Sequence, residues 1–390
     1  MGNHGSRIAS IVVLGALGLC ASMAKADFTL WNDEQLTVDQ PHSLGMLFDH
    51  SQAYVVSGGS VNNTLSANDA STVNISGGSV SYLSSRHSSI VNISGGSVGN
   101  IFAPSYTMSL DARDTSTVNI SGGSVNNTLS AYARTSVDIS GGSVGSLFAY
   151  NSSTVNISGG AVNNTLSTND DAIVDISGGS AGYLYTHNAS ILNILGGAMG
   201  SLHANDASTV NISGGSIGSI FATSTSTANI SGGTMSSILA YDTSTVTFLV
   251  RGFRLGEGLS LTGGRILGLG YLSGEWLDGT RWTSSIGKNA TGATIRAITP
   301  LPGDANHDGL VDVGDLGILG ANYGATSGKN WLTGDFTGDG AVDVGDLGVL
   351  GAHYGAGVPA AVPEPATLGL LVLGLAWPLL RRRRNSRCAG

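Results

Sequence analysis

A short repeat between residues 57 and 233 limits the folds that are open to this chain of 390 residues. Gly-Gly pairs begin at residues 58, 77, 95, 122, 141, 159, 178, 196, 214 and 232. Successive pairs are 18 or 19 residues apart, except for one step of 27 residues after position 95. A fixed short period predicts a solenoid, in which each unit buries its apolar face only against its neighbours.

Each unit contains two strand signals on either side of the Gly-Gly pair. Before the pair, Val155 and Ile157 alternate with polar residues, so both are expected to point inward. After the preceding pair, Val144, Leu147 and Ala149 supply a second inward set. The turn between the strands is expected to need glycine because at least one residue there takes a positive φ.

Stacking of the units predicts a mainly β protein: a parallel β-solenoid of about eleven coils of 18–19 residues over residues 27–247. The extra residues of the longer units, at residues 104–110 and in Asn-Asn-Thr-Leu segments such as 62–65, are expected to bulge on loops. Equivalent isoleucines would form an internal ladder and equivalent asparagines an external one: Ile75, Ile93, Ile120, Ile139, Ile157 and Ile176 inside, and Asn74, Asn92, Asn119 and Asn156 outside.

The two ends of the chain predict export. Residues 8–21 are largely apolar and are followed by Ala24-Lys25-Ala26, an A-x-A cleavage pattern, so residues 1–26 are expected to be a secretion signal. A lipoprotein site at Cys20 is rejected because Leu19 is too large for the preceding position. Cys20 and Cys388 are the two cysteines of the chain, and both lie in segments expected to be removed. This excludes a disulfide framework and a cysteine-based zinc site in the processed chain.

The C-terminal segment begins with Pro363-Glu364-Pro365, continues through the apolar residues 366–380 and ends in four arginines, Arg381 to Arg384. Fifteen apolar residues are fewer than the roughly 20 that span a bilayer comfortably. The order resembles the PEP-CTERM sorting signal of bacteria that make extracellular polysaccharide. The resemblance implies that residues 362–390 insert transiently in the membrane and are cut by a processing protease; a plain C-terminal anchor is the alternative.

The net charge excludes nucleic acid as a partner. The whole chain has a formal charge of −9, but residues 27–364 contain 10 Lys or Arg against 26 Asp or Glu, which gives −16. Binding to phosphates needs clustered basic residues, which this segment lacks.

The strongest chemical signal is a duplicated acidic loop within residues 303–357. Oxygen-bearing side chains at loop positions 1, 3, 5, 9 and 12, with glycine at 6 and a backbone carbonyl at 7, are typical of an EF-hand-type calcium loop. The sequence therefore predicts two Ca²⁺ sites. The expected ligands are Asp304, Asn306, Asp308, Leu310, Asp312 and Asp315 in the first loop, and Asp335, Thr337, Asp339, Ala341, Asp343 and Asp346 in the second.

Aspartate at position 12, with a short helix after each loop and none before it, resembles a type I dockerin. The helices are expected to pair through one apolar face, formed by Leu316, Leu319 and Tyr323 and by Leu347, Leu350 and Tyr354. Dockerins bind cohesin partners through Ser or Thr at positions 10 and 11. Here those positions are Val313-Gly314 and Val344-Gly345, so calcium binding carries over from the resemblance and cohesin binding does not.

Residues 248–300 lose the repeat and contain Trp276 and Trp282, and we expect them to form a β cap over the last coil. Three functions then stay open. The first is a non-catalytic surface or matrix protein associated with exopolysaccharide. The second is a β-helix hydrolase or lyase acting on polysaccharide through Asp111, Asp114, Asp138 or Asp175, and the third is a carbohydrate-binding protein that uses Trp276. The turn residues Asp69, Asp170 and Asp206, and His87, His187 and His203, are interpreted as solvated turn positions.

Overall fold

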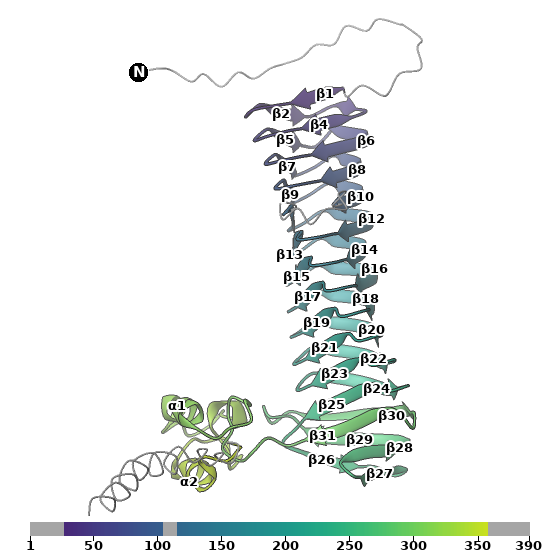
Figure 1. Ribbon diagram of the computed structural model, residues 1–390. Helices are drawn as coiled ribbons and strands as arrows, with labels where there is room; N and C mark the ends of the chain where they lie inside the picture. Colours follow the sequence, from purple (N-terminus) through teal and green to yellow (C-terminus); the bar gives the residue numbers. More distant parts are fainter. Residues whose placement is uncertain (1–26, 104–114, 358–390) are drawn as a thin grey trace, which may run out of the picture. The chain divides into compact units, whose positions relative to one another are not determined.

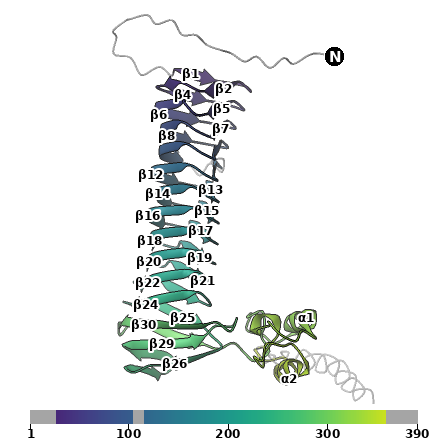
Figure 2. The same cartoon turned by 180° about the vertical axis from the view of Figure 1, so that it is seen from behind.

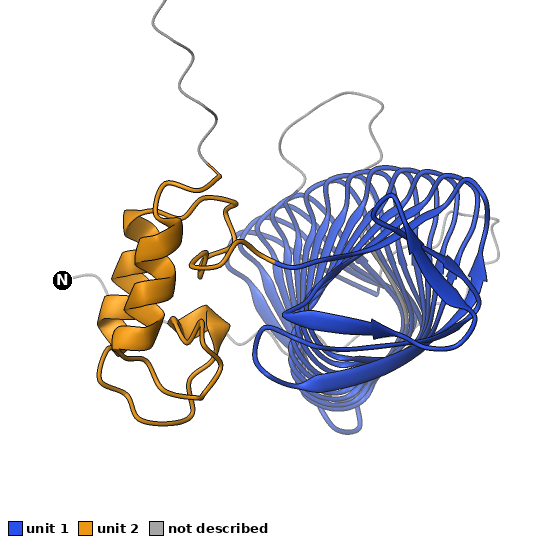
Figure 3. Ribbon diagram, turned by 90° about the horizontal axis from the view of Figure 1, so that it is seen from below, with its two compact units in different colours: residues 1–299 blue, residues 300–390 orange. Residues whose placement is uncertain are grey.

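The structure, a computed structural model, describes residues 27–103 and 115–357. It consists of two compact units, one ending at Thr299 and the other beginning at Pro300, which Figure 3 shows in separate colours. The predicted secretion signal (1–26), the inserted residues 104–110 and the predicted sorting tail (362–390) lie outside the described residues.

The first unit is the predicted parallel β-solenoid, with about eleven coils (Figures 1 and 2). Each coil places one longer strand in one sheet, here called sheet A, and one short strand in a second sheet, sheet B. In spatial order, sheet A contains β1 (Phe28–Leu30), β4 (Gly45–Leu47), β6 (Ser60–Ala67), β8 (Ser79–Ser85), β10 (Ser97–Ala103), β12 (Ser124–Ala131), β14 (Ser143–Ala149), β16 (Ala161–Thr168), β18 (Ser180–Thr186), β20 (Ala198–Ala204), β22 (Ser216–Ala222), β24 (Thr234–Ala240), β30 (Arg281–Asn289), β29 (Gly270–Glu275) and β26 (Gly252–Leu255), with β3 (Pro41–His42) beside β6.

Sheet B runs along the same coils and consists of strands of four or five residues. It contains β2 (Gln35–Val38), β5 (Gln52–Val55), β7 (Thr72–Ile75), β9 (Ile90–Ile93), β11 (Thr117–Ile120), β13 (Ser136–Ile139), β15 (Thr154–Ile157), β17 (Ile173–Ile176), β19 (Ile191–Ile194), β21 (Thr209–Ile212), β23 (Thr227–Ile230), β25 (Thr245–Leu249) and β31 (Thr294–Ile298).

The predicted ladders are confirmed. In sheet B, Ile75 pairs with Ile93 and Ile93 with Ile120, and the register continues without a shift to Ile176. All six isoleucine side chains are buried, and so are Val144, Leu147 and Ala149 of sheet A. Both inward sets therefore form one continuous core.

The external asparagines are bonded to one another along sheet B. The Asn92 amide donates to Asn74 Oδ1 at 2.9 Å, and the Asn119 amide donates to Asn92 Oδ1 at 2.8 Å. Asp138 and Asp175 occupy the same position in two coils and accept from Asn156 at 2.7 Å and Asn193 at 2.6 Å. The outward polar groups thus bind the coils to each other as well as facing water.

The Gly-Gly turn depends on glycine for two different reasons. The second residue of the pair takes a positive φ, as predicted, for example 72° at Gly160. The first residue is packed so closely that a Cβ on Gly159 would lie 2.4 Å from the carbonyl oxygen of Ser140 in the preceding coil. A side chain at this position would therefore push two coils apart.

The Asn-Asn-Thr-Leu segments differ from expectation, because their extra residue lies within a strand and not in a loop. The register of sheet A shifts between Val61 and Thr64, and pairing is regular again at Leu65 and Leu83. A bulge of this kind absorbs one residue in the strand while keeping the inward leucines aligned.

The end of the solenoid also differs in part from the predicted cap over residues 248–300. After β25 the chain leaves the coil, forms β26, the hairpin of β27 (Leu259–Thr262) and β28 (Arg265–Gly268), and β29, and then returns as β30 and β31. Strands β30 and β31 pair in parallel with β24 and β25, so one more coil lies inside the predicted cap. Strands β29 and β26 are antiparallel and end the parallel stacking in sheet A.

Aromatic rings fill the core at this end. Trp282 stacks on Phe248 and Trp276, with ring centroids 4.9 and 4.7 Å apart. Trp276 is 1% exposed, and its Nε1–H donates to the Gly233 carbonyl at 2.9 Å. The cap interpretation accounts for these residues. Because Trp276 is buried, the carbohydrate-binding hypothesis loses the residue on which it was based.

The second unit contains, among its described residues, the helices α1 (Val313–Asn322) and α2 (Val344–His353) and the 3₁₀ turn η1 (Trp331–Thr333). The predicted apolar face is only partly correct. Leu319 and Leu350 are buried, but Leu316, Tyr323, Leu347 and Tyr354 are exposed. Trp331 and Phe336 form an edge-to-face pair and supply further buried apolar surface in this unit. Within residues 27–103 and 115–357, no helix is long and apolar enough to cross a membrane.

The Gly-Gly packing yields a prediction. Replacing Gly159 with Ala should lower the free energy of unfolding by roughly 2 kcal/mol or more, because the new methyl group overlaps a backbone oxygen that cannot move without displacing a coil. Thermal and urea unfolding followed by circular dichroism would measure the change.

A matched control is Gly252→Ala in β26, where a Cβ would meet no atom within 4 Å. This variant should unfold close to the parent chain. Equal effects of the two substitutions would contradict the packing argument.

Candidate metal centre

The two acidic loops fold in the same way. In the first, the Gly309 N–H donates to Asp304 Oδ2 at 3.1 Å, and the Leu310 N–H donates to Asp308 Oδ1 at 2.8 Å. In the second, the matching bonds run from Gly340 to Asp335 at 2.8 Å and from Ala341 to Asp339 at 2.9 Å. The sequence duplication is therefore a duplication of loop geometry.

The aspartates at loop positions 9 and 12 begin the helices. Asp312 is the N-cap of α1 and accepts from the Gly314 N–H at 2.7 Å, while the Asp312 N–H donates to Asp315 Oδ2 at 2.9 Å. Asp343 and Asp346 form the same capping box at the start of α2. The D-x-x-D spacing is a helix-start signal as well as a metal-ligand signal, and the sequence reasoning used only the second meaning.

Four carboxylates are buried in these loops without a Lys or Arg partner among the described residues. Asp304, Asp315, Asp335 and Asp346 are each 2% exposed or less. Among the described residues no Lys or Arg pairs with them; the lysine of this unit, Lys329, bonds to the Asn322 side chain at 2.9 Å. Buried carboxylates without a counter-charge are costly, so this arrangement favours a bound cation.

Asp304 is the most informative of the four. Its Oδ1 is buried and has no hydrogen-bond partner in the structure. Burial raises the pKa of Asp304 and the nearby charge of Asp315 raises it further, whereas backbone N–H bonds from Gly309 and His307 lower it. An unpartnered buried oxygen is the group that a metal ion would satisfy.

His307, at loop position 4, interacts with the Asp304 carboxylate through its backbone N–H. It takes a left-handed φ of 58°, where the second loop has Gly338 at 77°. Burial lowers the pKa of His307, against the opposing charges of Asp304 and Asp315. In both loops, a left-handed residue at position 4 makes the tight turn between the ligands at positions 3 and 5.

The remaining predicted ligands lie on the loops without converging into a closed cluster. Asn306 bonds to Asp308, with its amide 3.0 Å from Asp308 Oδ2 and its Oδ1 accepting from the Asp308 N–H at 2.9 Å. Thr337 Oγ1 lies 3.4 Å from Asp335 Oδ1. In residues 27–103 and 115–357, no three His, Cys, Asp or Glu side chains form a group that could hold a metal as placed.

Sequence reasoning did not identify the residues that support the first loop from behind. The Trp331 Nε1–H donates to the Asp304 carbonyl at 2.7 Å, and both residues are buried. An aromatic residue between the two acidic loops was the available signal, but its partner cannot be inferred from spacing.

The donor set fits a hard cation. All the predicted ligands present oxygen from carboxylate, amide, hydroxyl or backbone carbonyl groups, which suits Ca²⁺. Bound Ca²⁺ would supply positive charge to buried carboxylates. In the first loop an ion would be held from the buried side by Asp304 and Asp315, with Asn306, Asp308, Leu310 and Asp312 as the other ligands. In the second loop an ion would be held from the buried side by Asp335 and Asp346, with Thr337, Asp339, Ala341 and Asp343 as the other ligands.

Two of the four residues of the enzyme hypothesis lie in the part of the chain that the structure describes. Asp138 and Asp175 belong to the outer ladder of sheet B, with Asn156 between them. Asp111 and Asp114 lie outside the described residues.

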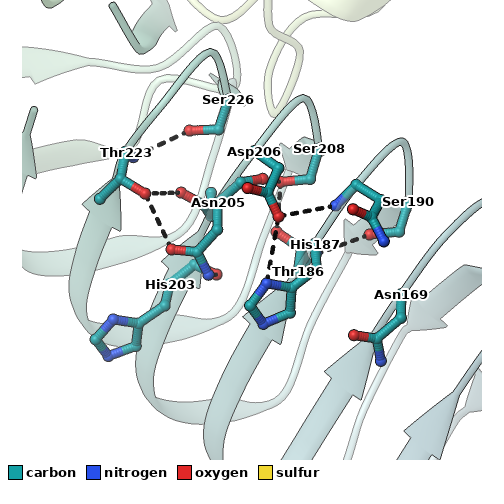
Figure 4. A network of polar contacts seen from close by, with 12 residues as sticks. Asn169, Thr186, His187, Ser190, His203, Asn205, Asp206, Ser208, Thr223 and Ser226 are labelled. Atoms are coloured by element: carbon teal, nitrogen blue, oxygen red, sulfur yellow. Dashed lines mark hydrogen bonds and ion pairs between the residues drawn. The ribbon is translucent and has the colours of Figure 1, made fainter. Parts of the chain in front are cut away.

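The other candidates lie mostly in the turns beside sheet A, and Figure 4 shows two of them, His187 and Asp206. Asp69, Asp170 and Asp206 share a left-handed turn position, and His87 and His187 lie beside Asp69 and Asp206 at 3.1 and 3.5 Å.

His203 is an exception to the predicted turn assignment. It lies within β20, where its ring stacks between Tyr185 at 4.8 Å and Phe221 at 4.5 Å. Burial in this stack lowers the pKa of His203.

No protein-family model, curated protein sequence or solved structure matches this chain.

The buried carboxylates predict that calcium stabilises the second unit. Chelation with EGTA should lower the melting temperature of the transition that belongs to residues 303–357, and excess CaCl₂ should restore it. Differential scanning calorimetry of the full chain would measure this.

The double variant Asp304→Ala with Asp335→Ala should abolish the calcium response, because it removes position 1 of both loops. As a control, Asp138→Ala with Asp175→Ala removes two acids from sheet B and should leave the response intact. The same melting temperature with calcium and with EGTA would contradict the assignment.

Proposed function

We propose that this protein is an exported, non-catalytic component of a cell surface or extracellular matrix, associated with exopolysaccharide and carrying a calcium-stabilised dockerin-like module. The observation that carries the proposal is the use of outward polar residues along sheet B. They bond coil to coil, as Asn92 does with Asn74 at 2.9 Å, and the pattern recurs along the solenoid. Such bonding between coils supports a structural role for the solenoid.

Export and sorting rest on the sequence. The A-x-A pattern at residues 24–26 and the Pro-Glu-Pro, apolar and arginine-rich order of residues 362–390 support delivery to the surface, with transient membrane insertion of the tail before a protease removes it. The lack of cysteine in residues 27–361 suits an oxidising exterior, because no thiol can be oxidised there.

Calcium would have a structural role in this proposal. The ion would neutralise the buried carboxylates of residues 303–357 and fix the starts of α1 and α2, where Asp312 and Asp343 are N-caps. Calcium is supplied outside cells, so the module would be stable where the chain is delivered.

A direct test separates this proposal from the enzyme alternative. Full-length chain incubated with a broad panel of polysaccharides should release no reducing ends or unsaturated products. In cells that produce the protein, fractionation should recover it with the surface or matrix polysaccharide. Cleavage that is lost in Asp138→Asn or Asp175→Asn, or recovery of the chain in the cytoplasmic fraction, would contradict the proposal.

A further inference from the structure

Three exposed tyrosines lie in a single column on the outer face of sheet A. Tyr82 in β8, Tyr183 in β18 and Tyr271 in β29 are 53%, 54% and 65% exposed. Among the described residues, none of the three rings stacks on another aromatic ring. Their ring faces are therefore available to a ligand.

Strand register connects the three tyrosines through small polar residues. From Tyr183 the pairing runs to Ser201, Ser219, Ser237 and Ser285, and Ser285 pairs with Tyr271. In the other direction, Tyr183 pairs with Thr165. The pairing of Leu147 with Leu166 places Ser146 beside Thr165. From Ser146 the pairing continues to Thr128, then to Asn100 and finally to Tyr82. We call these eleven positions the tyrosine column.

The spacing of the tyrosines is regular. Five strand steps separate β8 from β18, and five separate β18 from β29 (Figure 2). At ~4.8 Å a step, neighbouring tyrosines are about 24 Å apart along the sheet. A ligand that contacts all three must be extended and run across the strands.

At Ser201 and Ser219 the column has glycine on one side and aromatic rings on the other. Gly200 and Gly218 precede Ser201 and Ser219, so no side chain covers the backbone there. On the other side the rings of Tyr185, His203 and Phe221 are half-buried and stacked on each other, so they offer mainly ring edges.

The chemistry of the column fits sugar rings. The C–H face of a pyranose packs on an aromatic ring, and its hydroxyls exchange hydrogen bonds with Ser and Thr hydroxyls. Ser237 and Ser219 already bond at 2.8 Å, which orients hydroxyls along the column. None of the eleven positions is charged, and residues 27–364 carry a net charge of −16, so a polyanionic chain would be repelled.

We infer that the tyrosine column is a binding face for a neutral, linear polysaccharide, an inference that rests on the proposed association with exopolysaccharide. Tyr82, Tyr183 and Tyr271 each stack on one sugar ring, and the serine and threonine hydroxyls between them bond to the intervening sugars. Single contacts are weak, and simultaneous contacts by one chain give retention through avidity. A protein partner fits less well, because the apolar surface is divided into three separate rings and forms no continuous patch.

Affinity electrophoresis of the full-length chain tests the inference. The probes in the gel are the neutral linear polysaccharides hydroxyethyl cellulose, linear mannan, linear galactan and linear xylan, with alginate as the polyanionic comparison. At least one neutral probe should retard the chain, and alginate should not. The triple variant Tyr82→Ala, Tyr183→Ala, Tyr271→Ala should weaken retardation about tenfold or more, whereas the triple change to Phe keeps the rings and should retain most of it.

The control is Tyr323→Ala with Tyr354→Ala. It removes two tyrosines of similar exposure (53% and 55%) from the C-terminal ends of α1 and α2, outside the column, and should leave retardation unchanged. Melting curves check that each variant is folded. No retardation by any neutral probe, or equal retardation of the alanine triple variant, would overturn the inference. If the alanine triple variant is not retarded in the gel but still fractionates with the matrix, the column binds glycan and another contact holds the protein in the matrix. If the parent chain is absent from the matrix fraction, the proposed function itself is contradicted.

Discussion

The solenoid depends on parallel backbone hydrogen bonding in two sheets at once. This bonding places equivalent positions of successive coils ~4.8 Å apart, so every residue type must tolerate a copy of itself above and below. Isoleucine does so by packing, and asparagine by donating its amide to the next carbonyl, as Asn211 does to Asn193 at 2.8 Å. Stacked charged residues of one sign are less stable, because like charges at this distance repel.

The turns beside sheet A show how aspartate is accommodated under the same constraint. Over residues 170–242 the left-handed position is occupied in successive coils by Asp170, Asn188, Asp206, Ser224 and Asp242, so no two of these carboxylates are adjacent. Asp49 and Asp69 do occupy it in adjacent coils near the other end. The carboxylates instead accept bonds from the intervening residues, with Asn188 donating to Asp170 at 2.9 Å and Ser224 to Asp242 at 3.0 Å. The acidic composition of the solenoid is thus compatible with stacking, and it leaves the tyrosine column free of charge.

The second unit is built on a different principle. Each of its two helices is ten residues long and buries one leucine, Leu319 in α1 and Leu350 in α2. Four carboxylates are buried in the two acidic loops. Short helices with so little apolar contact need another source of stability, and a divalent cation at each loop would provide it. The proposed surface role would then combine a rod held by repetition with a module held by metal.

The repeat of 18 or 19 residues was enough to predict the solenoid, its period, the inward isoleucines and the external asparagines, because it sets which positions stack. The pairing of the two acidic loops was also evident from the sequence. Other features depended on contacts between distant segments. The tertiary structure placed the extra residue of the Asn-Asn-Thr-Leu segments in a strand bulge, buried Trp276 in the core and left Leu316 and Tyr323 at the surface. It also aligned Tyr82, Tyr183 and Tyr271, because register across bulged and antiparallel strands is set by packing between segments and has no signal in the spacing along the chain.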